Sequence, residues 1–195
     1  DLARAQALYW KLCRRVCDVM RHADSDPKAL SALESALAET YFGNFSVFQS
    51  VPDAWAIGQL FPVLPIHRLD ELPTQRAVVA DLTCDSDGVL DRFVDPVEAK
   101  PVLELHPLRD EEPYILGVPL VGAYQEILGD LHNLFGDTNA VHVSLAQDGA
   151  PTIETVVAGD RVETVLGYVQ YESKVLLERI QAAVERAVAV DEGIA

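Results

Sequence analysis

A single cysteine lies inside a run of carboxylates in the segment ADLTCDSDGVLDRF, residues 80 to 93. Cys84 follows an apolar stretch and is accompanied by Asp81, Asp85 and Asp87. Nearby negative charge disfavours a thiolate, which predicts a protonated thiol that is a poor nucleophile and a good proton donor. The aspartates could also bind a guanidinium or ammonium group through charge-assisted hydrogen bonds. An acidic, solvated hairpin beside a buried cysteine would carry the same residues, so the pattern alone leaves these interpretations open.

Other chemical signatures are missing from the sequence. It contains no G-x-G-x-x-G, no phosphate loop ending in G-K-[ST], no H-E-x-x-H and no C-x-x-C. Cys13 and Cys17 lie one helical turn apart and are expected to be buried apolar side chains, not a metal or redox pair. The five histidines have no ligand spacing and are expected to be structural or on the surface: His22, His67, His106, His132 and His142. No metal site is predicted.

Length and charge narrow the class of protein. The chain has 195 residues, 49% of them hydrophobic, and a formal net charge of −16. Such an acidic chain is a poor partner for nucleic acid, which requires clustered Lys and Arg. No apolar run reaches the roughly 18 residues of a membrane span, and no signal peptide is recognisable, so we expect a cytoplasmic protein. The first residue is Asp1 and the sequence stops inside a helical pattern, which predicts a fragment.

Helical periodicity marks both ends of the chain. Residues 2 to 22 and Pro27 to about Thr40 predict a helical hairpin, and Asp26 is the expected cap of its second helix. Residues 123 to 137 predict a helix inside the strand-rich region, and a long amphipathic helix is expected from Arg161 onward.

Strand patterns occupy the middle of the chain. Between residues 52 and 73, several prolines exclude long regular elements. Alternating and β-branched runs then predict strands, and Ser86-Asp87-Gly88 is a hairpin signal between the first two. We expect an antiparallel sheet or barrel with strands at 76–83, 89–94, 101–108, 114–122, 139–147 and 151–159.

Three long motifs resemble the C-terminal part of the biosynthetic arginine decarboxylases. They are NFSVFQSVPDAWAIGQLFPVLPIHRL, DLTCDSDGVLD and LVGAYQEILGDLHNLFGDTNAV, and they occur in the family's order. The resemblance covers about residues 41 to 190, and the preceding helices are similar to the family's inserted helical region.

The resemblance implies a pyridoxal-phosphate enzyme of the alanine-racemase-like class, fold type III. It implies an α+β fold: an antiparallel β-barrel or sheet domain with an N-terminal helical hairpin and a long C-terminal helix. We expect a helical segment at 1–40, the β-rich decarboxylase domain at 41–160 and a C-terminal helical segment at 161–195. The family's (β/α)8 barrel, which carries the cofactor lysine, is absent from this sequence. None of Lys11, Lys28, Lys100 and Lys174 stands in the expected context.

The resemblance also assigns roles to individual residues. Cys84 matches the cysteine that reprotonates the substrate α-carbon after carbon dioxide leaves. Asp85 matches the position expected to hold the distal cation of the substrate, and Asp87 is a second candidate for that role. Tyr124 matches the tyrosine that hydrogen-bonds the cofactor phosphate, beside the backbone N–H groups of a helix start. Trp55 belongs to the motif and is expected to pack.

The implied activity is conversion of L-arginine to agmatine and carbon dioxide in polyamine biosynthesis. The implied partners are the enzyme's own barrel domain and further subunits, in a homodimer or homotetramer with shared active sites, and a Mg²⁺ requirement is left open. The fragment is expected to be inactive without the barrel. Two alternatives stay open: a non-catalytic homologue that regulates a decarboxylase, and a decarboxylase for ornithine, lysine or diaminopimelate.

Overall fold

The computed structural model describes residues 1–23 and 26–190, without the side chain of Val190. Its contacts separate two compact units, Asp1–Asp130 and Leu131–Ala195. Helices and small sheets occur together, as the predicted α+β class requires. Among the described residues, no helix combines the length and apolar character needed to cross a bilayer. The three segments expected from the sequence, 1–40, 41–160 and 161–195, stay a prediction, and the expected end inside a helix falls on residues 191–195, outside the described part.

The described residues of the first unit form five helices and six strands. Its helices are α1 (Leu2–His22), α2 (Pro27–Leu37), α3 (Val47–Ser50), α4 (Pro52–Ala56) and α5 (Ala123–Ile127). Its strands are β1 (Glu39–Phe42), β2 (Leu64–Pro65), β3 (Gln75–Ala80), β4 (Val89–Leu90), β5 (Leu103–Leu105) and β6 (Leu116–Gly117).

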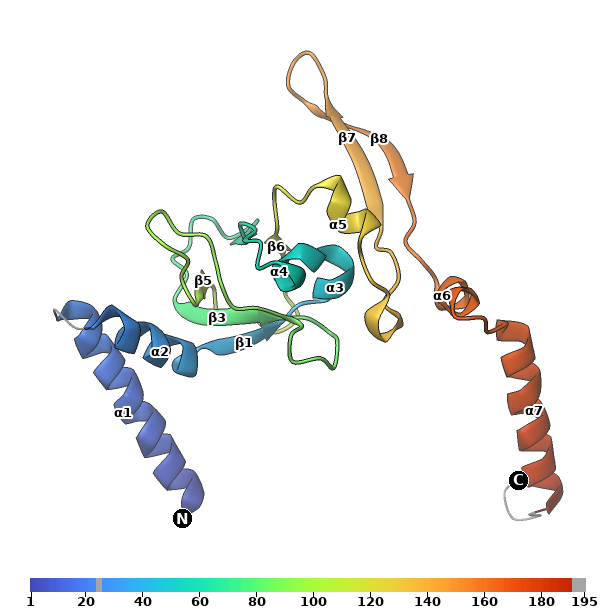
Figure 1. The fold of residues 1–195 in the computed structure, drawn as a ribbon, viewed down its shortest axis with the longest axis horizontal. Coiled ribbons are helices and arrows are strands. Elements are labelled where there is room, and N and C mark those ends of the chain that lie inside the picture. The colour runs from blue at the N-terminus through green and yellow to red at the C-terminus, as the bar shows by residue number, and fades with distance from the viewer. Residues whose placement is uncertain (24–25, 191–195) are drawn as a thin grey trace. The chain divides into compact units, whose positions relative to one another are not determined.

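β3 is the central strand of the first unit (Figure 1). It pairs antiparallel with β4 and β5, as expected, but parallel with β1. The prediction of a purely antiparallel sheet was therefore wrong for β1, which follows directly after α2 and occupies residues expected at that helix's end. The strands predicted at 89–94, 101–108 and 114–122 were also too long, because prolines and turns leave only two or three residues in β4, β5 and β6. The two-residue strand β2 was not predicted. Among the described residues, the strands form three separate sheets and no closed barrel.

One apolar cluster fills the space between this sheet and the short helices. α3 contributes Val47, which is fully buried, and Val51 lies between α3 and α4. Burying side chains of this size contributes about 1.5 to 3 kcal/mol each. The cluster is Tyr41, Val47, Val51, Phe61, Ala77, Val79, Leu90, Phe93, Leu103 and Leu105.

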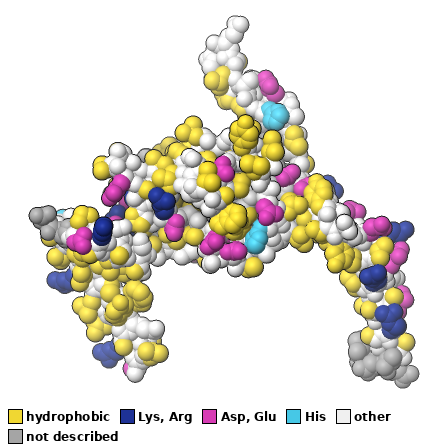
Figure 2. Space-filling model, in the orientation of Figure 1, with side chains coloured by type: hydrophobic (Ala, Val, Ile, Leu, Met, Phe, Trp, Pro, Cys, Tyr) yellow, Lys and Arg dark blue, Asp and Glu magenta, His cyan; other side chains and the backbone are white. Residues whose placement is uncertain are grey.

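The predicted helical hairpin is confirmed. Asp26 caps α2 by accepting the backbone N–H of Lys28 at 3.0 Å. Glu34 on α2 accepts from Arg21 of α1 at 2.9 Å and pairs with Arg76 of β3 at 3.0 Å, which ties the hairpin to the sheet. Figure 2 shows yellow hydrophobic side chains along α1; its exposed apolar residues are Leu2, Leu8, Tyr9, Trp10, Leu12, Val16 and Val19.

Up to residue 190, the second unit is described as a hairpin and two helices. They are β7 (Ala140–Leu145), β8 (Pro151–Val157), α6 (Val162–Tyr168) and α7 (Ser173–Val190), preceded by the 3₁₀ turn His132–Leu134. The helix predicted at 123–137 ends at Ile127, and the positive φ of Asn133 and Leu134 keeps the later part of that range from being α-helical. The helix predicted from Arg161 is likewise two helices, separated where Gln170 has a φ of 67°. Side chains strain that left-handed conformation, so neither break could be predicted from apolar periodicity.

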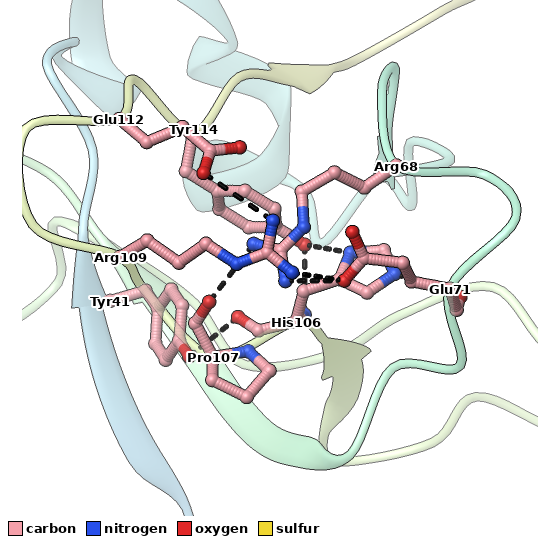
Figure 3. A network of polar contacts seen from close by, with 8 residues as sticks. All are labelled: Tyr41, Arg68, Glu71, His106, Pro107, Arg109, Glu112 and Tyr114. Atoms are coloured by element: carbon pink, nitrogen blue, oxygen red, sulfur yellow. Dashed lines mark hydrogen bonds and ion pairs between the residues drawn. The ribbon is translucent and has the colours of Figure 1, made fainter.

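A polar network holds the loops around β5 (Figure 3). His106 is buried, and its Nδ1 lies 2.8 Å from the Tyr114 hydroxyl. Its Nε2 lies 3.0 Å from the carbonyl oxygen of Glu71, and because a carbonyl only accepts, Nε2 carries the proton. Tyr41 donates to the carbonyl of His106 at 3.0 Å. The expectation of a structural histidine is met at this position.

Glu71 makes the ionic part of this network and gives the protein a predictable acid sensitivity. Hydrogen bonds from Arg68 and then Arg109, at 2.8 and 2.7 Å, outweigh desolvation and lower the pKa of Glu71 from 4.5 to about 2. A carboxyl whose pKa is lowered by folding stabilises the fold at any pH above its pKa in the unfolded chain. This contribution is lost as the pH falls through its pKa in the folded chain.

We therefore expect Glu71→Gln to be less stable than wild type at neutral pH, with a difference that shrinks between pH 4.5 and about 2. Urea unfolding followed by circular dichroism at several pH values measures this difference. A constant difference across the whole range would contradict the role of Glu71. Glu112→Gln is a suitable control, because its longer 3.4 Å contact with Arg109 lies at the exposed edge of the network.

Candidate active site

The carboxylate-rich segment forms a closed turn between β3 and β4, which we call the acid turn, residues 81–88. Backbone hydrogen bonds close it: Asp81 donates to the carbonyl of Gly88 at 2.8 Å, and Gly88 donates to that of Asp85 at 3.1 Å. The pairing of Val79 with Leu90 and of Ala80 with Val89 continues the hairpin. The turn predicted at Ser86-Asp87-Gly88 is confirmed, and it is held at its base by the central strand.

Asp81 anchors the acid turn. Its side chain is 2% exposed. One carboxylate oxygen accepts the backbone N–H of Val47 at 2.8 Å, and the other accepts the N–H and hydroxyl of Thr83 at 2.8 and 2.7 Å. The sequence grouped Asp81 with the carboxylates around the thiol, but it serves the buried start of α3 instead. Its charge is compensated by these three donors.

Cys84, Asp85 and Asp87 are exposed on the same turn. Asp85 accepts the backbone N–H of Asp87 at 2.9 Å, an arrangement typical of aspartate in turns. Asp87 in turn accepts the indole N–H of Trp55 at 3.2 Å. A thiol and two carboxylates thus share one solvent-facing loop, where a proton donor and a receptor for a cation could serve the same ligand.

Tyr124 lies on α5, and its side chain is exposed. Its neighbour Gln125 is buried and makes a reciprocal pair with Asp53 of α4. Gln125 accepts the backbone N–H of Asp53 at 3.1 Å and donates its amide to the Asp53 carboxylate at 2.6 Å. Because α4 also carries Trp55, this one short helix contacts both the acid turn and the helix of Tyr124.

The resemblance implies pyridoxal phosphate, and of the residues described above only Tyr124 offers a group for its phosphate. The exposed hydroxyl of Tyr124 is a donor suited to a phosphate oxygen, whereas α5 has only five residues, so the helix start adds less than the sequence suggested. The cofactor's aldehyde requires a lysine. Lysines occur on α1, α2 and α7 and beside β5, where Lys100 pairs with Glu104. None of them lies on the acid turn, α4 or α5, and the described residues hold no group of three or more metal-ligating side chains.

Three linking residues had no functional prediction: Asp53, Trp55 and Gln125. Trp55 was expected only to pack. Asp53 and Gln125 are 72 positions apart, so no local spacing relates them. The sequence offered one signal, a tryptophan within a short segment that begins at Pro52. That Trp55 stays half exposed is visible only in the structure.

Nearly the whole chain is similar in sequence to known proteins. The protein shares 55% identity with the biosynthetic arginine decarboxylase of Thermosynechococcus vestitus, over 98% of this chain and 30% of the relative. It shares 56% with that of Gloeobacter violaceus, over 96% of this chain and 30% of the relative. The chain is homologous to biosynthetic arginine decarboxylases. The resemblance identified from the sequence motifs is confirmed.

A solved structure and a protein family are also similar to this chain. The crystal structure of the biosynthetic arginine decarboxylase SpeA from Campylobacter jejuni superposes with a TM-score of 0.64 at 34% identity, over 86% of this chain and 27% of that one. Residues 162–194 match the family described as the arginine decarboxylase C-terminal helical extension. The chain spans about 30% of the length of the curated decarboxylases that it matches.

Proposed function

We propose that this chain is the C-terminal part of an enzyme that decarboxylates L-arginine to agmatine for polyamine biosynthesis. The observation that supports this most directly is the 55% identity to a biosynthetic arginine decarboxylase over nearly the whole chain. The rest of the parent protein supplies the (β/α)8 barrel and the cofactor lysine, and this part alone is inactive. Sites shared between subunits of a homodimer or homotetramer, and a cytoplasmic location, belong to the same proposal.

The acid turn binds and protonates the substrate in this proposal. Asp85 and Asp87 receive the guanidinium group, since a carboxylate matches its paired N–H donors. Both carboxylates are exposed, as a site for a soluble cation requires. Cys84 stands on the same turn and donates a proton to the substrate α-carbon once carbon dioxide has left.

Tyr124 binds the phosphate group of the cofactor in this proposal. When bound, pyridoxal phosphate supplies the electron withdrawal that makes loss of carbon dioxide feasible. The Tyr124 hydroxyl donates to a phosphate oxygen and fixes the position of that group relative to the acid turn. The proposal assigns no role to a Mg²⁺ ion.

Carbon dioxide release by the full-length enzyme tests this function. Labelled arginine, ornithine, lysine and diaminopimelate would be compared at equal concentrations, and we expect release from arginine to exceed the others by about 100-fold or more. Preference for another amino acid would overturn the substrate assignment and leave the enzyme class. No release from any substrate, together with binding of the chain to an active decarboxylase, would support a regulatory homologue instead.

A further inference from the structure

We propose that α4 is the positioning element of this site: Trp55 orients Asp87 toward the substrate, and Asp53 orients Tyr124 toward the cofactor phosphate through Gln125. The inference rests on the proposed function and adds residues to which that function assigns no role. Its basis is that one helix makes side-chain hydrogen bonds to both functional segments.

α4 is suited to this role because it is fixed to the core. Pro52 begins the helix and is buried, and the preceding Val51 is 3% exposed. The backbone N–H of Ala54 donates to the carbonyl of Val51 at 2.9 Å, which closes the first turn. A helix start with these contacts cannot move without disturbing the apolar cluster.

Trp55 links the fixed helix α4 to the acid turn. Its ring meets the buried Phe48 edge-on, with centroids 5.2 Å apart and planes at 70°. The ring is therefore held on one side, and its N–H points to Asp87 at 3.2 Å. This bond engages Oδ2 of Asp87. Asp87 is thereby presented to a guanidinium in one orientation, at lower entropy cost than a freely rotating carboxylate.

Gln125 links α4 to α5, the helix that carries Tyr124. Gln125 is 5% exposed, and Asp53 engages both polar atoms of its amide, so a flipped amide would lose both hydrogen bonds. The segment that follows α5 is held separately, because Asp130 donates its backbone N–H to the carbonyl of Phe48 at 2.9 Å. With α5 fixed at Gln125 and the chain after it fixed at Asp130, the exposed side chain of Tyr124 has a defined base.

Trp55→Phe tests the substrate end in the full-length enzyme. It removes the indole N–H and keeps an aromatic ring against Phe48, so we expect the KM for arginine to rise roughly tenfold with a small change in kcat. Trp10→Phe on α1 is the matched control and should leave both constants unchanged. If wild type is active on arginine and Trp55→Phe keeps its KM within about twofold, the role of Trp55 is overturned.

Gln125→Glu tests the cofactor end by placing a carboxylate against that of Asp53. We expect the Kd of the full-length apoenzyme for pyridoxal phosphate, measured by absorbance titration, to rise roughly tenfold. Adding Asp53→Asn should rescue the affinity, because the amide and carboxylate are then exchanged between the two positions. General damage to the fold would not be rescued, and unchanged affinity in Gln125→Glu would overturn the role of this pair.

These readouts separate the inference from the proposed function. If wild type releases no carbon dioxide from arginine, the function fails, and the substrate-end role of Trp55 fails with it. The cofactor-end role is still decided by affinity and rescue, because pyridoxal phosphate binding is measured without turnover. If wild type is active and neither variant changes its constant, only the positioning role of α4 is overturned.

Discussion

Replacing Cys84 by alanine in the full-length enzyme is expected to slow agmatine formation by about 100-fold or more, the usual contribution of a positioned proton donor. Cys84 is exposed on the acid turn, which is closed by backbone hydrogen bonds and need not change when the thiol is removed. The expected loss is therefore chemical and not structural. KM for arginine should change little, since Asp85 and Asp87 remain.

The same variant should also change the product. Without a donor for the α-carbon, a proton delivered to the cofactor's carbon leads after hydrolysis to a guanidino-aldehyde, while the amino group of arginine stays with the cofactor. Chromatography of the products measures the ratio of aldehyde to agmatine. Ser86→Ala, an exposed change in the same turn, is the matched control and should form agmatine only. Agmatine alone at a normal rate from Cys84→Ala would remove the thiol from the mechanism.

The elements that could be predicted from the sequence are those specified by local signals. Asp26 and Pro27 define the start of α2, because a cap and a proline at the first helical position act within one turn. Asp87-Gly88 locates the hairpin for the same reason. The acid turn with Cys84 at its exposed side was therefore within reach of sequence reasoning, and so was the placement of Asp85 and Asp87 beside it.

The roles that could not be predicted depend on distant partners. Asp81 has the same residue type and spacing as its exposed neighbours, but its partner Val47 is 34 positions away. The break after α5 has a similar cause: a Cβ at Gly129 would lie 2.4 Å from the carbonyl oxygen of Gln49, so close approach between segments selects glycine there. The link from Asp53 to Gln125 likewise exists only after folding. Charge and spacing therefore locate the acid turn, and tertiary contacts decide which of its carboxylates are buried and which are exposed.

Asp81→Ala is expected to destabilise the chain by on the order of 3 kcal/mol, since it removes a buried charged acceptor from three donors. The backbone N–H of Val47 would be left buried without its partner, and Thr83 would lose both of its bonds to the carboxylate. Thr83→Val should cost less, about 1 kcal/mol, because it removes only the hydroxyl donor. Urea unfolding of the 195-residue chain measures both values.

Gly88 offers an independent way to disturb the same carboxylate. A Cβ at this position would lie 2.2 Å from Oδ1 of Asp81 and 2.5 Å from Oγ1 of Thr83, so Gly88→Ala must push the anchor out of place. Gly122→Ala is the matched control, because nothing lies within 4 Å of its Cβ. If Asp81 anchors the turn, Gly88→Ala and Asp81→Ala lower the free energy of unfolding less in combination than the sum of their separate effects. Strict additivity, or an Asp81→Ala chain as stable as wild type, would show that the turn is held by its backbone bonds alone.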